Sequence, residues 1–309
     1  WLNAIPIVRY SILTNEGAAN LRLHRYHEAG KKFIEALQYN PDDEKAIENA
    51  AFGYLLLGES SKAKELASNV LNNNNPTSSR AYSIIIQSTS SEEEIEKVIS
   101  EIPEYVKKTQ DVAHVIGNYA YNKGDLNRAK KWLEISIKNE IENIPDIRAL
   151  LGSVLLQMVL TDPTTIPMYQ LNADQKELLT RSIELFTSSW DAMIDPNLQK
   201  LHIPWLVNRG IAKRLLNDHG EYKRDIDDAF NLDSSNQNNI YFKALSEFEN
   251  GEYEKAIHLL KDLLGVKEHP GVLSLYLESL RKSEKFENAI DEINKFLRID
   301  ICSDEKDKL

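Results

Sequence analysis

A short helical pattern recurs along this 309-residue chain at a nearly constant interval. The stretches "RYHEAGKKFIEAL" (25–37) and "EYEKAIHLLKDLL" (252–264) place small, charged and large apolar residues in the same order. The alanine of the pattern is found at Ala29, Ala63, Ala129, Ala256 and Ala289. Ala63 follows Ala29 by 34 positions, Ala129 follows Ala63 by 66, and Ala289 follows Ala256 by 33. A period close to 34 predicts stacked repeats instead of one compact core.

Each repeat is expected to contain two helices joined by a tight turn. A larger side chain such as Phe33 or Leu133 stands four residues after the alanine, on the same helical face. The small residue lets a neighbouring helix approach, and the larger one fills the remaining gap. Upstream, a first helical stretch ends at Gly58, Gly124 or Gly251. Glycine just past a helix end adopts the left-handed conformation at little cost, so each one predicts a helix stop.

This unit resembles the tetratricopeptide repeat, which has an apolar residue and glycine in its first helix and a small residue, an aromatic residue and proline afterwards. The best matches are Ile116-Gly117 with Ala129 and Leu133, Gly17 with Ala29, Phe33 and Pro41, and Gly210 with Ile226 and Ala229. The resemblance covers nearly the whole chain. It implies an all-α fold, an α-solenoid in which antiparallel helix pairs stack into a right-handed superhelix.

We expect one array over residues 1–309, built from about eight helix pairs. The predicted repeats are approximately 10–43, 44–76, 77–109, 110–144, 145–193, 203–236, 237–269 and 270–303. The fifth repeat contains an insertion at 161–173, after which a helix is expected to resume at Asp174, capped by Glu177. Insertions in repeat proteins map to loops, often on the functional face, although a long loop without a role also costs little. Residues 194–205 are a second irregular connector.

Two repeats depart from the pattern. Residues 77–109 have the right length but lack the small residues, and Ser91 with Glu94 predicts a capping box at the start of their second helix. In the sixth repeat, Tyr222 stands where the small alanine belongs. We expect that helix pair to be splayed or rotated.

Composition narrows the classes of partner. The formal net charge of −11 argues against nucleic acid, because phosphate binding requires clustered Lys and Arg. No apolar run approaches the roughly 20 residues that span a bilayer, so no membrane contact is expected. The single cysteine, Cys302, cannot form an internal disulfide, which favours a reducing, cytoplasmic location. The chain begins at Trp1 without an initiator methionine, so we expect a fragment of a longer protein with an upstream domain.

Motifs that carry chemistry are missing from the sequence. It contains no glycine-rich phosphate loop, no GxSxG elbow and no HExxH metal motif. His24 and His27 are three residues apart, but no pattern of cysteines or carboxylates completes a metal site around them. We therefore predict no enzymatic activity, no cofactor and no metal.

Relatives with this repeat commonly hold a peptide or a partner's helix in a concave groove lined by the first helices. By position, the candidate groove residues are Phe52, His114, Asn118, Tyr121, Asn122, Arg214, Tyr241, Glu278 and Arg281. Aromatic side chains supply binding energy and amides pair with a peptide backbone. The carboxylate-binding variant of the groove is not expected, because Thr14 and Ala18 stand where it needs lysine and asparagine.

These observations favour a non-catalytic scaffold that binds a protein or peptide segment. One alternative is the sensor or regulatory arm of a larger signalling protein, such as a signal-transduction NTPase. A second is an enzyme with its site in the insertion at 161–173, a segment that carries no recognisable catalytic motif.

Overall fold

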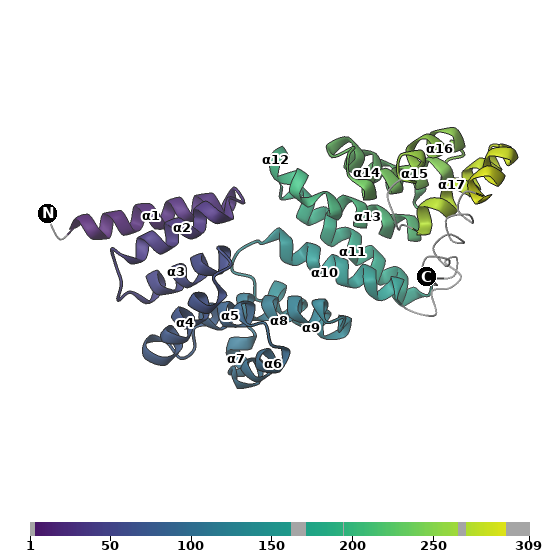
Figure 1. Ribbon diagram of the computed structural model, residues 1–309. Helices are drawn as coiled ribbons and strands as arrows, with labels where there is room; N and C mark the ends of the chain where they lie inside the picture. The colour runs from purple at the N-terminus through teal and green to yellow at the C-terminus, as the bar shows by residue number, and fades with distance from the viewer. Residues whose placement is uncertain (1–3, 162–170, 194, 265–269, 295–309) are drawn as a thin grey trace, which may run out of the picture. The chain divides into compact units, whose positions relative to one another are not determined.

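The computed structural model describes residues 4–161, 171–193, 195–264 and 270–294 (Figure 1). The described residues form helices and turns and no β-strand, which confirms the predicted all-α class. Contacts along the chain divide it into two compact units. Unit 1 is Trp1–Gln170 with Asp191–Leu198, and unit 2 is Leu171–Trp190 with Gln199–Leu309. That the two units continue one superhelical array stays a prediction.

Unit 1 is a series of antiparallel helix pairs in which each helix packs on the next along the chain. Its helices are α1 (Ala4–Arg22), α2 (Tyr26–Leu37), α3 (Glu44–Leu56), α4 (Ser60–Asn69) with the π-helical turn η1 (Val70–Asn74), α5 (Ser79–Ser88), α6 (Glu92–Glu101), the short α7 (Glu104–Lys107), α8 (Gln110–Asn122), α9 (Leu126–Lys138) and α10 (Pro145–Leu160). Local contacts of this kind let each pair cover the apolar stripe of its neighbour.

Unit 2 repeats the arrangement. It contains α11 (Ala173–Asp191), the 3-10 turn η3 (Lys200–His202), α13 (Ile203–Leu215), α14 (His219–Leu232), α15 (Gln237–Glu249), α16 (Tyr253–Lys261), α17 (Pro270–Lys282) and a final helical stretch at 286–294. The short α12 (Pro196–Gln199) lies in the connector between α11 and α13, which is therefore partly helical. Most of the insertion, 162–170, lies outside the described residues.

Small residues set how closely the helices approach. A Cβ atom added to Gly117 would lie 2.7 Å from Leu133, and one added to Gly17 would lie 2.7 Å from the Phe33 ring. Both distances are shorter than a normal van der Waals contact, so only glycine fits. Ala29, Ala63, Ala129 and Ala256 are fully buried, whereas Ala289 is half-buried. At Gly17 and Gly117 the large residue of the second helix, Phe33 or Leu133, makes the packing contact with the first helix.

The turn between the two helices has the same left-handed residue in six of the described pairs, but not between α5 and α6, where Thr89 has φ −97°. Gly58, Gly124 and Gly251 have φ values of +77°, +76° and +81°, which confirms them as helix stops. The same turn position is occupied in other pairs by His24 (φ +55°), Asn217 (φ +63°) and Glu284 (φ +60°). An L-amino acid other than glycine is strained in this region, and asparagine is the least strained of the three.

Two predicted caps differ from those observed. Ser91 caps α6 by accepting a hydrogen bond from the backbone N–H of Glu94 at 3.4 Å, but the Glu94 carboxylate pairs with Lys64 at 2.6 Å. Only half of the predicted capping box therefore forms. Helix α11 starts at Ala173, one residue before the predicted Asp174. Its reciprocal cap joins Asn172 and Gln175, at 2.8 and 3.0 Å, in place of the predicted Glu177.

Tyr222 is fully buried between α13 and α14, with 1% of its surface exposed. A Cβ atom on Gly210 would lie 3.3 Å from Ile226 and 3.4 Å from Tyr222, against 2.7 Å at the equivalent contact of Gly117. The space beside Gly210 is therefore wider than the space beside Gly117. That this helix pair is splayed or rotated stays a prediction. The Tyr222 hydroxyl lies 3.4 Å from the carbonyl oxygen of Phe242 on α15, to which it donates.

Replacing Glu284 by glycine should stabilise unit 2. The change removes left-handed strain of roughly 1–2 kcal/mol, partly offset by the higher chain entropy of glycine, so the net gain should be about 0.5–1 kcal/mol. Thermal unfolding followed by circular dichroism measures it. The reverse change at the equivalent turn, Gly251→Glu, should lower the unfolding temperature. Equal stability of both variants and the parent chain would contradict the strain argument.

Candidate partner-binding surfaces

The predicted groove residues of α8 differ in accessibility. Asn118 and Asn122 are exposed, and Tyr121 is half-buried. His114 is half-buried, and the charges of two carboxylates act on it: Asp111 on the same helix and Asp146 at the start of α10. Burial lowers the pKa of His114, and the two carboxylates oppose that shift only in part. His114 is therefore biased toward its neutral form, in which it can both donate and accept a hydrogen bond.

Phe52 is not a freely exposed anchor. Its ring lies 6.3 Å from the Phe33 ring, and the guanidinium of Arg80 on α5 stacks over it at 5.3 Å from the centroid. Next to it on α3, the nearly buried Glu48 accepts a hydrogen bond from the hydroxyl of Ser78. Burial raises the pKa of the Glu48 carboxyl, which the Ser78 bond and the nearby Arg80 charge counteract. Phe52 thus contributes to a polar and aromatic surface shared by α3 and α5.

In unit 2 two of the predicted residues are engaged within the fold. Arg214 donates to Glu249 at 2.7 Å, linking α13 to α15. Tyr241 is half-buried and stands edge-on to Phe242, with ring centroids 5.4 Å apart. Arg214 joins neighbouring repeats, and Tyr241 also packs against an apolar cluster of α15, α16 and α17, which limits what the two residues can offer a partner.

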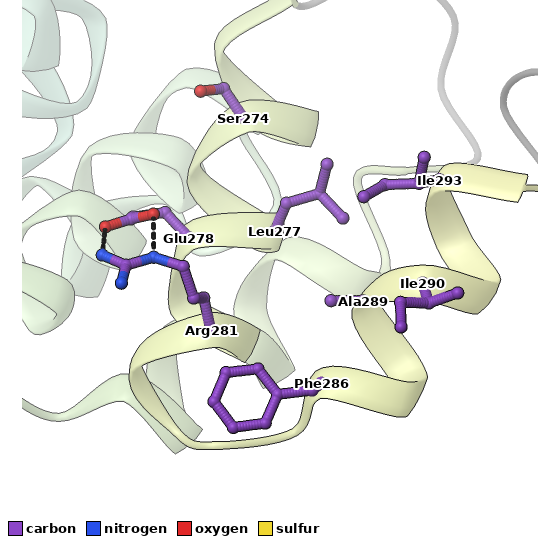
Figure 2. A pocket seen from close by; sticks show the side chains of 8 residues that line it. All are labelled: Ser274, Leu277, Glu278, Arg281, Phe286, Ala289, Ile290 and Ile293. Carbon is purple, nitrogen blue, oxygen red and sulfur yellow. Dashed lines mark hydrogen bonds and ion pairs between the residues drawn. The ribbon is translucent and has the colours of Figure 1, made fainter.

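Glu278 and Arg281 lie together on α17, where Arg281 donates to Glu278 at 2.8 Å (Figure 2). They line a cleft between α17 and the helical stretch 286–294, called here the C-terminal cleft. The sequence placed both residues on one helix face but did not reveal that they neutralise each other or that a cleft lies beside them.

A second cleft, the α13–α15 cleft, was not anticipated from the sequence. Its volume is about 390 Å³, within the range of roughly 300–1,000 Å³ that is usual for ligand sites. Its lining residues are Lys200, Leu201, Ile203, Pro204, Val207, Asn208, Ile211, Asp233, Asn236, Asn238, Asn239 and Phe242. The floor is aliphatic and aromatic, and the rim is rich in amides. The asparagine run in "SSNQNN" (234–239) was the one signal available in the sequence.

The rim of the α13–α15 cleft is held in place by its own hydrogen bonds. The buried Asn239 amide donates to the carbonyl oxygens of Ala229 and Asp233, at 3.3 and 2.9 Å. Asn236 caps α15 by accepting from the backbone N–H groups of Asn238 and Asn239. Asn208 is half-buried and Asn238 is exposed, and both residues line the cleft.

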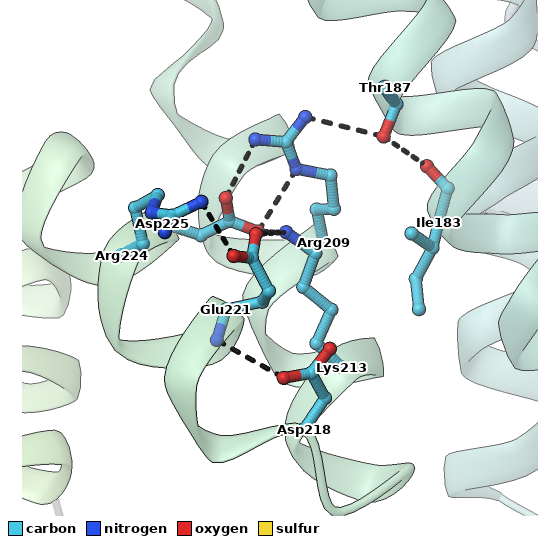
Figure 3. A network of polar contacts seen from close by, with 8 residues as sticks. All are labelled: Ile183, Thr187, Arg209, Lys213, Asp218, Glu221, Arg224 and Asp225. Carbon is cyan, nitrogen blue, oxygen red and sulfur yellow. Dashed lines mark hydrogen bonds and ion pairs between the residues drawn. The ribbon is translucent and has the colours of Figure 1, made fainter.

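A buried ionic network positions α13, which forms one wall of this cleft (Figure 3). The Asp225 carboxylate of α14 is 2% exposed and receives two bonds from Arg209, at 2.7 and 3.0 Å, and one from Lys213 at 2.9 Å. Arg209 also donates to the hydroxyl of Thr187 on α11 at 3.3 Å. Glu221 extends the network, lying 3.5 Å from Lys213. These contacts link α13 to α14 directly through the Asp225 carboxylate, and link α11 to α13 through Arg209.

The described residues contain no group of three or more His, Cys, Asp and Glu side chains arranged to hold a metal ion. None of their helices combines the length and the apolar character needed to cross a bilayer.

Comparison with known proteins supports the fold. The sequence profile of the family described as anaphase-promoting complex, cyclosome, subunit 3 matches residues 225–296. The structure of the APC/C hetero-tetramer Cut9–Hcn1 is similar, with a TM-score of 0.56 and 16% identity over 89% of this chain and 48% of that one. This chain therefore spans about half the length of that relative. Human IFIT1, in a dimer with PPP-AAAA, gives a TM-score of 0.58 and 13% identity over 94% of this chain and 73% of that one.

No curated protein sequence matches the chain significantly. Identities of 13–16% define a shared fold only. Together with the recurrent turn conformation and the small-residue contacts, they define the fold as an array of tetratricopeptide-type helix pairs. This class of α-solenoid serves in general as a scaffold for protein interactions.

Removing the central carboxylate of the network should destabilise unit 2 strongly. Asp225→Ala leaves Arg209 and Lys213 buried without their counterion, which costs about 3–5 kcal/mol. Urea unfolding with a probe in unit 2 measures the loss. Glu59→Ala, which removes an exposed partner of Lys62, is the control and should leave the midpoint unchanged. A loss for Asp225→Ala no larger than that of the control would contradict the assigned role.

His114 should make stability depend on pH. Its folded pKa lies below the ordinary value, so between about pH 7 and 5 the unfolded chain takes up a proton first and stability falls. In His114→Gln this component is missing, so the urea midpoint of the parent chain should drop relative to the variant as the pH decreases. His219→Gln, at an exposed site, is the control. Parallel curves for the parent chain and His114→Gln would exclude the effect.

Proposed function

We propose that the chain is a non-catalytic scaffold that holds a segment of a partner protein against the surface formed by the first helices of its repeats. The observation that carries this proposal is the α13–α15 cleft, with its apolar floor and its rim of amides. A cleft of about 390 Å³ accepts a few side chains of a segment and not a folded domain. The family match over 225–296 supports it, because those residues include α15 and the amide-rich turn before it.

The chemistry of the cleft suits a peptide. Side chains such as Val207 and Ile211 offer apolar contact to one or two anchor residues, which supply most of the binding energy in peptide recognition. The amides of Asn208 and Asn238 can pair with backbone N–H and C=O groups of an extended segment. The structure holds the rim in place before binding, so little ordering entropy opposes association.

The first-helix surface of unit 1 is a second candidate surface for a protein segment. Asn118 and Asn122 expose amides, Tyr121 and Phe52 offer aromatic edges, and a neutral His114 adds a donor and an acceptor. We take the partner to be a protein and not a nucleic acid, because the net charge of −11 opposes phosphate binding. A cytoplasmic setting, suggested by the single cysteine, is part of the same proposal.

Selection from a phage-displayed peptide library tests the function. Peptides chosen on the parent chain should share apolar anchors and should bind at least tenfold more weakly to Ile211→Lys, which puts a charge on the cleft floor. Ile141→Lys, at a site that is 88% exposed in unit 1, is the matched control and should bind as the parent does. A second variant, Asn118→Ala with Tyr121→Ala, reports on unit 1. Circular dichroism melts confirm that each variant folds.

Selected peptides that bind Ile211→Lys as well as the parent would exclude the α13–α15 cleft as the site. If the double variant in unit 1 alone abolished binding, the recognition surface would lie on α8 instead.

A further inference from the structure

Helix α1 leaves one long face exposed. It packs mainly on α2, where Gly17 lies against the Phe33 ring. On the opposite side, Ile7, Val8 and Ile12 are 64%, 54% and 58% exposed. The side of a soluble helix that faces water normally carries charged and polar residues. Neighbouring exposed aliphatic side chains of this kind mark interaction sites more often than isolated ones do.

The exposed face of α1 carries no charge over most of its length. Between positions 4 and 21 the only charged residues are Arg9 and Glu16. Arg9 donates to the Tyr39 hydroxyl at 3.2 Å, and Glu16 pairs with Lys32 at 3.2 Å, so both reach back toward α2 and the turn after it. In a chain with a net charge of −11, an uncharged face is where two identical copies can meet without like-charge repulsion.

The residues of this face have the spacing of a helix–helix seam. Val8, Ser11, Asn15 and Ala18 are separated by three, four and three positions, so they follow one stripe along α1. When two such helices run antiparallel about a two-fold axis at the level of position 13, Val8 lies opposite Ala18 of the second copy. Ser11 then lies opposite Asn15. The first pairing sets a large side chain against a small one, and the second sets a hydroxyl against an amide.

The two polar residues of the stripe have hydrogen-bonding capacity to spare. The Ser11 hydroxyl donates to the carbonyl oxygen of Ile7 at 3.0 Å, and its oxygen can still accept. Asn15 is exposed and forms no hydrogen bond with another residue of the described part of the chain. Its amide can therefore donate to Ser11 of the second copy, and the symmetry forms this bond twice. A polar residue in a helix seam fixes register and orientation, and here each copy supplies the group that the other requires.

Arg22 favours the antiparallel orientation. It continues the stripe four positions after Ala18 and is exposed. In a parallel pair the two Arg22 side chains would lie side by side and repel each other. In the antiparallel pair they lie at opposite ends, roughly 27 Å apart at a rise of about 1.5 Å per residue.

We propose that the exposed face of α1 binds the same face of a second copy of this chain, with the two helices antiparallel. Val8 and Ile12 supply the apolar contact, and the Ser11–Asn15 pairs fix the register. One pair of helices should bury less than the roughly 1,200–2,000 Å² of stable specific interfaces, so we expect a dimer that dissociates in the micromolar range. This association is independent of peptide binding by the α13–α15 cleft, which lies in unit 2.

Sedimentation equilibrium of the full chain over the micromolar range tests the association. The parent chain should show a reversible equilibrium between monomer and dimer. Ile12→Asp brings two like charges to the centre of the seam and should raise the dimer Kd at least tenfold. Ile290→Asp, the same change at a 57% exposed site in the C-terminal cleft, is the matched control and should dimerise as the parent does. Circular dichroism melts confirm that both variants fold.

Disulfide cross-linking tests the orientation. Cys302→Ser removes the single native thiol and serves as the background. A tagged Ser11→Cys chain mixed with an Asn15→Cys chain should give mainly the mixed dimer on mild oxidation. In the antiparallel arrangement these two positions lie opposite each other, whereas two copies of position 11 are displaced by about 6 Å along the helix axis.

Three results would overturn the proposal. A chain that stays monomeric throughout the micromolar range would leave the face of α1 to another protein. Loss of the dimer in Ile290→Asp but not in Ile12→Asp would assign association to the C-terminal cleft. Cross-linking mainly between identical positions would exclude the antiparallel arrangement and the Ser11–Asn15 pairs. Ile12→Asp should still bind the peptides selected on the parent chain, so dimerisation and peptide binding can fail separately.

Discussion

The close approach of two helices at a small residue is the contact on which the rest of this protein depends. At Gly17 and Gly117 the partner side chain fills the space that a Cβ atom would need. Between α2 and α3 the backbones themselves meet, because a Cβ on Gly30 would lie 2.8 Å from the carbonyl oxygen of Gly53. Such contacts bring neighbouring helices close together, both within a pair and between successive pairs, and repetition of the pair produces the solenoid.

Polar contacts then set the register between successive pairs. Several ion pairs join residues about one repeat apart, among them Lys64–Glu94, Arg128–Glu96 and Lys285–Glu254. Exposed pairs of this kind add little to stability, so their main effect is on alignment. The Asp225 network is different because it is buried. Removing the carboxylate or one of its two cations would leave a buried charge without its partner, which strongly destabilises a fold. It anchors α13 and with it one wall of the α13–α15 cleft.

Both clefts lie beside a helix pair in which a large residue replaces a small one. Tyr222 is buried in α14 in place of the small alanine, and its hydroxyl donates to the carbonyl oxygen of Phe242, which lines the α13–α15 cleft. Leu277 lines the C-terminal cleft, twelve positions before Ala289, where Gly17 and Gly117 stand relative to Ala29 and Ala129. Both clefts thus lie next to departures from the repeat pattern.

The sequence alone determined the all-α class, the 34-residue period and the helix stops at Gly58, Gly124 and Gly251, because these follow from local spacing and backbone freedom. It also placed Tyr222 as an irregularity. Only the tertiary structure showed that Arg214 is paired with Glu249, and that Asn208 and Asn238, thirty positions apart, meet at one cleft. The caps of α6 and α11 were likewise decided by which partners lay within reach. Side-chain pairing between helices depends on their separation and rotation, which a periodic pattern does not encode.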